Sequence, residues 1–211
     1  MIDRIHRLGA GPDRRILGIV GGPGAGKSTL ATAIGRRGEQ DLPGRVAVVG
    51  MDGWHLANST LARLGRLERK GAPDTFDAAG YLAFLERFRT DTATTIWAPE
   101  YRRSVEESIG GALEIAPEVT LLVTEGNYLL LDDAPWDRIR GLLDEAWFLA
   151  PDEAARRDRL IARHRQVGRT PEEAVARADG SDAANAAVIA RTAHRADVRF
   201  DDDSVAGILG T

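Results

Sequence analysis

One stretch, Gly21-Gly22-Pro23-Gly24-Ala25-Gly26-Lys27-Ser28-Thr29, constrains this chain more than any other feature. It matches the pattern G-x-x-x-x-G-K-[ST], in which backbone amides surround phosphate groups. Glycines let successive N–H groups approach phosphate oxygens without a Cβ clash. The pattern predicts that Lys27 reaches the β- and γ-phosphates of a nucleotide and that the Ser28 hydroxyl ligates Mg²⁺.

The segments on either side fit such a loop. Residues 15–20 form a short apolar run typical of a buried parallel strand, and residues 30–34 begin a helix expected to end near Arg37. This order places a helix N-terminus at the phosphates, where free amides and the helix dipole favour an anion. We therefore expect ATP phosphates to be bound by Gly22, Gly24, Ala25, Gly26, Lys27, Ser28 and Thr29.

Composition bounds the remaining possibilities. A chain of 211 residues is expected to form a single domain, here 1–211 with an N-terminal arm over 1–14. The formal net charge of −4 gives no electrostatic case for nucleic acid, and the absence of cysteine excludes disulfides and thiolate metal sites. No apolar run reaches membrane-spanning length and the first residues lack a signal-peptide core, so we expect a cytoplasmic protein without a membrane partner.

Strand and helix patterns alternate along the rest of the chain. Residues 78–89 have a helical apolar face with Asp77 as a plausible N-cap, whereas residues 56–77 read as irregular. Further strands are expected at 45–51, 94–97, 112–115, 119–124, 146–149 and 196–200, and further helices at 136–145, 152–166, 171–178 and 182–195. The alternation predicts a three-layer α/β fold of the P-loop NTPase type, with a central mostly parallel sheet and an arginine-rich helical lid over about 152–170.

Two carboxylates end predicted strands. Asp52 follows strand 45–51 and Glu125 follows strand 119–124. Because parallel α/β sheets bind ligands at the carboxyl ends of their strands, both residues are expected beside the phosphate loop. We predict that Asp52 is a general base that also approaches Mg²⁺, and that Glu125 supports the metal together with Ser28. The alternative is that each carboxylate only caps a helix or lies in a loop.

The segment 152–166 is dense in arginine. Arg159, Arg163 and Arg169 are predicted to close over the phosphates as a lid and to stabilise the transition state. The alternative is a solvated helix face whose arginines pair with neighbouring carboxylates.

These residues resemble the phosphoribulokinase/uridine kinase group of P-loop kinases, which includes the bacterial pantothenate kinases. The resemblance runs from about Arg15 to Phe200. Its motifs are the phosphate loop, Met51-Asp52-Gly53, Pro73-Asp74-Thr75-Phe76-Asp77, Pro99-Glu100-Tyr101, Thr124-Glu125-Gly126-Asn127-Tyr128 and the Arg159…Arg163…Gly168-Arg169 lid. A subgroup labelled fructose-transport-system or nucleoside-kinase-like proteins is more similar still, through Met51-Asp52-Gly53-Trp54-His55-Leu56, residues 70–77, 125–131 and 159–164, and Ser181-Asp182-Ala183-Ala184-Asn185-Ala186.

The resemblance implies further site residues. Asn185 falls where the family's late segment approaches adenine, and Asp74 and Tyr101 fall in its substrate-binding motifs. His55 and Tyr128 are expected to line the acceptor pocket, with a packed loop and a core aromatic as the respective alternatives. Ser181 and Asp182 fall in the same segment as Asn185, with helix capping as the alternative. His164 lies among the lid arginines, with pairing to a carboxylate as the alternative.

Departures from the uridine kinase motifs bear on the acceptor. Gly71 stands where those kinases have an Asp that holds the ribose hydroxyls, Arg102 replaces a second Asp, and Glu106 replaces a base-reading His. A site built for a ribose diol loses strongly when one partner is missing, so uridine and cytidine are disfavoured. Arg102 and Arg103 point to an anionic substrate, unless they are only a surface pair.

Together the motifs predict an ATP- and Mg²⁺-dependent phosphotransferase. Its expected partner is a small hydroxyl metabolite that resembles a sugar, a nucleoside or pantothenate, and the family resemblance is compatible with a homodimer. The alternative is a P-loop nucleotide-binding regulator or NTPase switch without a small-molecule acceptor. A GTPase would carry N-K-x-D and an ABC-type ATPase L-S-G-G-Q, and neither sequence occurs here.

Overall fold

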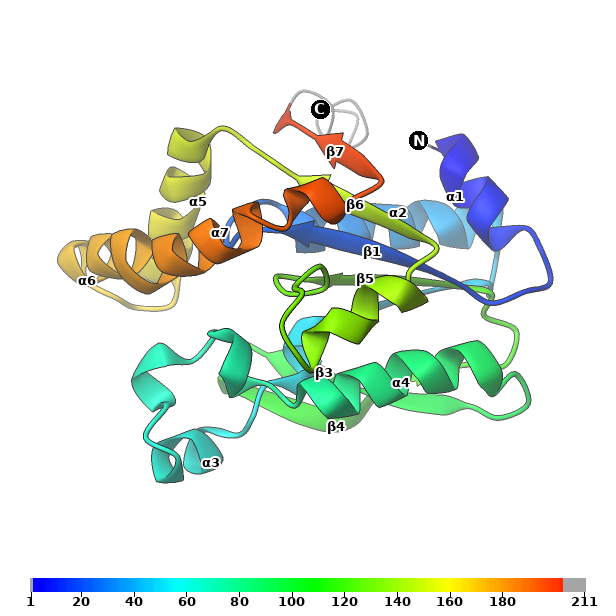
Figure 1. Ribbon diagram of the computed structural model, residues 1–211, viewed down its shortest axis with the longest axis horizontal. Helices are drawn as coiled ribbons and strands as arrows, with labels where there is room; N and C mark the ends of the chain where they lie inside the picture. The colour runs from blue at the N-terminus through cyan, green and yellow to red at the C-terminus, as the bar shows by residue number, and fades with distance from the viewer. Residues whose placement is uncertain (1, 203–211) are drawn as a thin grey trace.

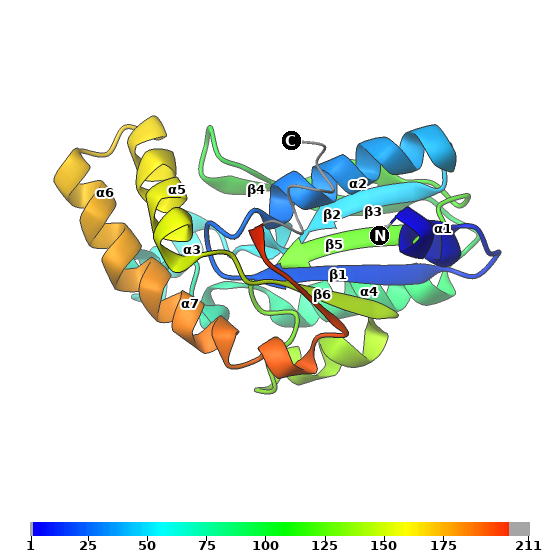
Figure 2. The same cartoon turned by 90° about the horizontal axis from the view of Figure 1, so that it is seen from above.

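A five-stranded sheet carries the phosphate loop in the computed structural model, which describes residues 2–202. The strands are Arg15–Gly21 (β1), Val46–Gly50 (β2), Leu121–Gly126 (β5), Glu145–Leu149 (β6) and Val198–Phe200 (β7). Their order is β2-β5-β1-β6-β7, and each neighbouring pair is parallel (Figure 2). The predicted α/β class and mostly parallel sheet are therefore confirmed.

Helices cover both faces of this sheet and one of its ends. The α-helices are Ile2–Gly9 (α1), Lys27–Asp41 (α2), Asn58–Arg63 (α3), Ala78–Thr90 (α4), Glu153–Gln166 (α5), Pro171–Arg177 (α6) and Ala183–Ala190 (α7). Figure 1 shows α1 and α2 on one side of the sheet, α4 on the other, and α5, α6 and α7 at the end where the phosphate loop lies. Among the helices within residues 2–202, none is both long enough and apolar enough to cross a membrane.

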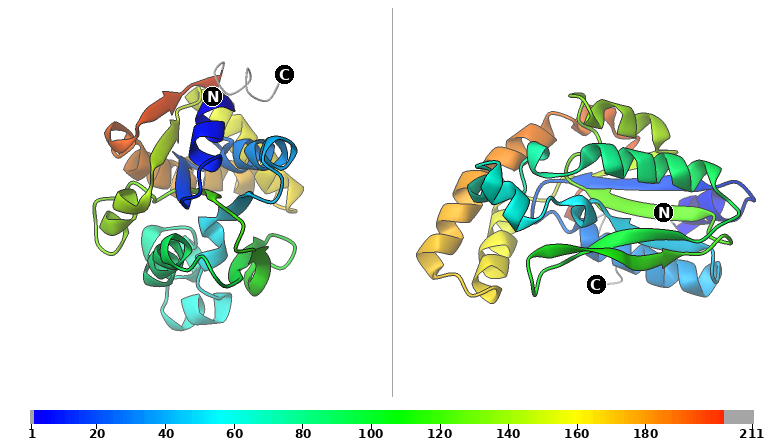
Figure 3. Two further views of the ribbon diagram at one scale, coloured as in Figure 1. Left: turned by 90° about the vertical axis from the view of Figure 1, so that its right-hand side faces the viewer. Right: turned by 90° about the horizontal axis from the view of Figure 1, so that it is seen from below.

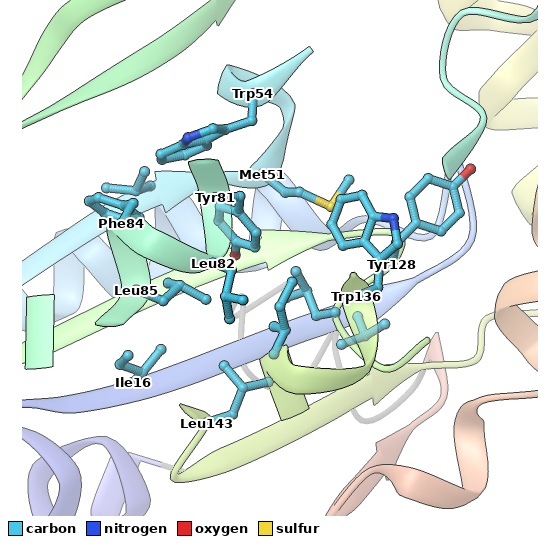
Figure 4. Packing of buried hydrophobic residues seen from close by; sticks show 14 of the residues in the cluster. Ile16, Met51, Trp54, Tyr81, Leu82, Phe84, Leu85, Tyr128, Trp136 and Leu143 are labelled. Atoms are coloured by element: carbon cyan, nitrogen blue, oxygen red, sulfur yellow. The ribbon is translucent and has the colours of Figure 1, made fainter. Parts of the chain in front are cut away.

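The core is divided by the sheet. On the α4 face, Ile16, Trp54 and Tyr81 belong to one buried cluster (Figure 4). Leu122 and Phe88 belong to the same cluster. Alternate strand residues pack against α1 and α2 on the other face, with Leu17, Ile19, Val123 and Trp147 among them. Because both faces are covered, these strands read in the sequence as continuous apolar runs.

Two predicted strands lie outside the central sheet. Ile96–Arg102 (β3) and Glu107–Ile115 (β4) pair antiparallel only with each other and form a hairpin beneath the sheet (Figure 3). They extend through most of the predicted polar segment 100–108, because cross-strand pairs reach Arg102 and Glu107 at the tip. Gly53 allows the hairpin to lie close, since a Cβ there would collide with the carbonyl oxygen of Pro99.

Several predicted boundaries differ from the structure. The predicted helix 136–145 is a 3-10 helix over Trp136–Leu142, and Glu145 already belongs to β6. The predicted helix 182–195 stops at Ala190. The irregular segment 56–77 contains α3 and two 3-10 turns. Asp77 does cap α4, since its Oδ1 accepts from the backbone N–H of Gly80 at 2.8 Å.

Candidate active site

The carboxyl ends of β1, β2 and β5 meet at one edge of the sheet. Gly50, two residues before Asp52, lies opposite Glu125 in the β2–β5 register, and Val20 lies opposite Gly126. A cavity of about 450 Å³ opens over this edge. Among the predicted site residues it is lined by Lys27, Ser28, Asp52, His55, Tyr101, Glu125, Arg163, Arg169 and Asn185.

The phosphate loop begins as β1 ends. Gly24 and Gly26 have φ of +79° and +90°, which L side chains rarely adopt. Lys27 is buried and donates from Nζ to the carbonyls of Gly21 and Gly22 at 2.9 and 3.1 Å and to Oδ1 of Asn127 at 2.7 Å. Burial lowers the pKa of the Lys27 ammonium, and the charges of nearby carboxylates oppose that shift.

Glu125 extends from the end of β5 toward the first turn of α2. Its Oε1 accepts a hydrogen bond from the Ser28 hydroxyl at 2.8 Å. Burial raises the pKa of the Glu125 carboxyl, and the Lys27 ammonium opposes this effect. The pair thus presents a hydroxyl and a carboxylate oxygen side by side at the cavity, an oxygen donor set that suits Mg²⁺.

Asp52 lies in a 3-10 turn, Met51–Trp54, directly after β2. Its Oδ1 is 3.9 Å from Nδ1 of His55 and its Oδ2 is 3.7 Å from Nη2 of Arg103. A second cavity, of about 260 Å³, adjoins the first and is also lined by Asp52 and Arg103. The carboxylate therefore faces open space with cationic or ionisable groups on two sides.

Packed aromatic rings form the side of the cavity next to Asp52. The buried His55 ring lies 4.0 Å from the Phe76 ring and 4.8 Å from that of Tyr101, centroid to centroid. Burial lowers the pKa of His55, chiefly through desolvation. The Tyr101 hydroxyl donates to Oε2 of Glu106 at 2.9 Å, and burial raises the pKa of Tyr101.

The α5–α6 lid covers the opposite side of the cavity. Arg163 is partly buried and lines it, and burial lowers the pKa of its guanidinium, with the like charge of Arg103 adding to the effect. Arg169 contacts Nδ1 of His164 through Nη1 at 2.6 Å, and Nε2 of His164 lies 2.7 Å from Oδ2 of Asp182. The proposed pairing of His164 with a carboxylate is therefore present.

The side of the phosphate loop formed by Gly22, Gly24, Ala25, Gly26 and Thr29 is not part of the cavity lining. Four predicted site residues outside the loop do not line the cavity either. Arg159 pairs with Asp202 at 2.6 Å. Asp74 is bound by Arg66 and Arg69. The other two are Arg102, which is exposed beside Glu100, and Tyr128, which is buried in the core with its hydroxyl on the carbonyl of Gly71 at 2.6 Å.

Other residues line the cavity although the sequence prediction did not assign them a site role. They include Lys70, Phe76, Asn127 and Arg177. Asn127 follows Glu125 by two positions at the end of a buried strand, and this position could have predicted that Asn127 lies in the site. Lys70 is one of only two lysines in the chain, which was a weaker signal.

A glycine-rich loop between a parallel strand and a helix, with strand-end carboxylates beside it and arginines above it, defines a P-loop kinase. No family model matches the chain. Known proteins do. The chain is 36% identical to a "putative fructose transport system kinase" from Silicibacter sp. TM1040, whose crystal structure matches with a TM-score of 0.82 over 90% of this chain and 91% of that one.

A "putative uridine kinase" from Schizosaccharomyces pombe is 30% identical over 179 residues, which are 82% of this chain and 76% of that protein. Phosphoribulokinase from Rhodobacter spheroides shares the fold alone, at 14% identity and a TM-score of 0.64 over 90% of this chain and 70% of that one. The chain belongs to the phosphoribulokinase/uridine kinase group of P-loop small-molecule kinases, as the sequence motifs predicted.

Proposed function

We propose that the protein transfers the γ-phosphoryl group of ATP to a hydroxyl of a small metabolite, with Mg²⁺ as cofactor and Asp52 as general base. The observation that carries this proposal is the meeting of Lys27, Ser28, Asp52 and Glu125 at one cavity. These are the parts that phosphoryl transfer needs: a cation for the phosphates, oxygen ligands for a metal and a carboxylate for the attacking hydroxyl.

Ser28 and Glu125 would hold Mg²⁺. Within residues 2–202 no group of three His, Cys, Asp or Glu side chains could hold a metal ion by itself, so nucleotide phosphates would complete the coordination. When bound, Mg²⁺ neutralises charge on the β- and γ-phosphates. Lys27 now bonds to two loop carbonyls and Asn127, and it would exchange some of these bonds for phosphate oxygens.

In the transfer, the acceptor oxygen forms a bond to the γ-phosphorus while the bond from that phosphorus to the β,γ-bridging oxygen breaks. The hydroxyl proton passes to the Asp52 carboxylate and ADP leaves. Arg163 faces the same cavity and would stabilise the charge on the transferring group. Arg169 also lines this cavity and contacts His164, whereas Arg159 pairs with Asp202 and does not line it.

The acceptor is a small hydroxyl compound of sugar, nucleoside-like or pantothenate-like character. The relative from S. pombe is named as a uridine kinase, but a ribose diol finds poor support here. Gly71 has no side chain to hold the diol, and the Glu106 carboxylate is already engaged by Tyr101. A ribose would therefore leave hydroxyls without partners.

The test is an ATP-consumption screen over a panel of hydroxyl metabolites, with the Asp52→Asn protein beside the wild type. One acceptor should stimulate ADP formation by the wild type, and Asp52→Asn should lower that rate by about 10²- to 10⁴-fold while nucleotide affinity is kept. A fully active Asp52→Asn protein would remove Asp52 from its role. Tight ATP binding without turnover on any acceptor would favour a nucleotide-binding regulator instead.

A further inference from the structure

Three cationic side chains from separate segments face the part of the cavity beside Asp52. Lys70 comes from the segment between α3 and α4, Arg103 from the tip of the β3–β4 hairpin, and Arg163 from α5. Within the described part of the chain, the Arg163 guanidinium has no hydrogen bond or ion pair, and Lys70 forms no ion pair with a carboxylate. Neither Arg163 nor Lys70 is therefore paired directly with a carboxylate, although the charges of nearby carboxylates act on both.

Arg103 is exposed, whereas Lys70 and Arg163 are half-buried. The contact of Arg103 is the 3.7 Å approach of Nη2 to Oδ2 of Asp52, which is too long for a hydrogen bond. A guanidinium carries five N–H donors in a planar fork that matches a carboxylate or phosphate. The neighbouring Arg102 lies outside both cavities, beside Glu100. Of this pair, Arg103 therefore lines the cavities beside Asp52 and Arg102 does not.

Lys70 is held in place by neutral acceptors. Its Nζ donates to Oδ1 of Asn58 and to the carbonyl of Glu106, both at 2.6 Å, and lies 5.1 Å from the centre of the Tyr101 ring. An ammonium has three donors, so one remains for a ligand. Burial lowers the pKa of Lys70, and the carboxylates of Glu107 and Glu106 oppose that effect.

The carboxylates nearby have other partners. Glu106 accepts from the Tyr101 hydroxyl, and Glu125 accepts from Ser28. Asp52 is the proposed base for the acceptor hydroxyl. Within residues 2–202, the carboxylate of Glu68 lines the cavity without a hydrogen bond or ion pair, and the groups with unused donors beside Asp52 are cationic. A neutral acceptor that excluded water would leave them unpaired, which costs free energy.

We propose, on the basis of the kinase function proposed above, that the acceptor carries a carboxylate or phosphate group bound by Arg103 and Lys70 while its hydroxyl meets Asp52. Arg103 then offsets the repulsion between this anionic group and the Asp52 carboxylate. The Arg103 guanidinium would also discriminate against uncharged sugars and nucleosides of similar size.

The first experiment measures anion binding without turnover. Protein saturated with Mg²⁺ and a non-hydrolysable ATP analogue is titrated calorimetrically with inorganic phosphate. We expect saturable binding to the wild type, a Kd at least about tenfold higher in Arg103→Gln, and little change in the matched control Arg102→Gln. Equal phosphate affinity in Arg103→Gln, or no saturable binding to the wild type, overturns the proposal. A weaker affinity of Arg103→Gln for the ATP analogue would assign Arg103 to the nucleotide and also overturn it.

The second experiment uses matched acceptor pairs, each hydroxy acid against its amide and each sugar phosphate against its free sugar. Only the charged member should stimulate ADP formation, and Arg103→Gln should raise its KM while the KM for ATP stays constant. Turnover of neutral members with Arg103→Gln unaffected refutes the anionic class and leaves the kinase function intact. Phosphate binding that depends on Arg103, without turnover of any pair, supports the anion site and counts against the proposed transfer.

Discussion

Arg156 in α5 donates from Nη1 to the carbonyl oxygen of Pro23 in the phosphate loop, at 2.8 Å. The Arg156 side chain is only 5% exposed. One residue along the loop, a Cβ on Gly24 would lie 2.8 Å from Cγ of Leu160. Helix α5 is thus packed directly on the loop that is expected to bind phosphates. Because Arg163 is on the same helix, this packing fixes its position relative to the loop.

Replacing Arg156 should destabilise the protein. Arg156→Ala leaves the buried Pro23 carbonyl without its partner, and we expect the free energy of unfolding to fall by about 1–3 kcal/mol. Arg157→Ala is the matched control, because Arg157 pairs with Asp179 at the exposed surface. Denaturant unfolding of both proteins measures the difference, and equal stabilities would contradict the role of Arg156.

Lys27 should be irreplaceable even by arginine. Its ammonium is enclosed by three oxygen acceptors at 2.7–3.1 Å, a space that a guanidinium fork does not fit. We expect both Lys27→Ala and Lys27→Arg to lower turnover by about 10²-fold or more. Steady-state kinetics with circular dichroism as a folding check would measure this, and near-wild-type turnover of Lys27→Arg would show that only charge matters.

His164 and Arg169 should behave as one unit. Because arginine has no acceptor, the contact requires an unprotonated Nδ1 on His164, which leaves Nε2–H to donate to Asp182. His164→Ala should lower kcat by freeing Arg169, and the double variant with Arg169→Gln should cost little more than the larger single change. Additive losses would disprove the coupling. Arg165→Ala, an exposed neighbour on α5, should leave kcat unchanged.

His55 should make stability depend on pH. Burial holds its folded pKa below the ordinary value of about 6.5, so the unfolded chain binds more protons in that range. The free energy of unfolding should therefore be highest above this value and fall as the pH drops below it. His55→Gln should flatten this slope, whereas His194→Gln at an exposed position should not. Parallel slopes in all three proteins would exclude His55.

Local patterns were enough to predict the centre of the molecule. The strand before the loop, the loop itself and the strand that delivers Glu125 are each specified by contiguous residues, and their parallel pairing brings Asp52 to the same edge. The pairing of Arg159 with Asp202 joins residues 43 positions apart, and helical spacing gives no information about such a partner. From helical spacing alone, both Arg159 and Arg163 were therefore predicted to close over the phosphates.

The arginine pair shows what a longer predicted strand would have revealed. β3 runs to Arg102, and successive strand side chains point to opposite faces. Tyr101 and Arg103 line the cavity whereas Arg102 does not. Alternation would have separated Arg102 from Tyr101, and Arg103 lies in the turn that follows the strand. The polar composition of residues 100–108 gave no sign of a strand there. Similarly, the apolar spacing at 136–145 could not distinguish a 3-10 helix from an α-helix.

The hairpin has a consequence for how this enzyme can diversify. β3 and β4 exchange backbone hydrogen bonds with each other and not with the central sheet, and buried Ile96, Ala98 and Ile115 attach them to the core. Tyr101 and Arg103 therefore belong to a hairpin separate from helix α2, which begins at Lys27, and from strand β5, which carries Glu125. If the acceptor is bound as proposed, an exchange of residues 96–115 would alter the choice of acceptor and leave Lys27 and Glu125 in place.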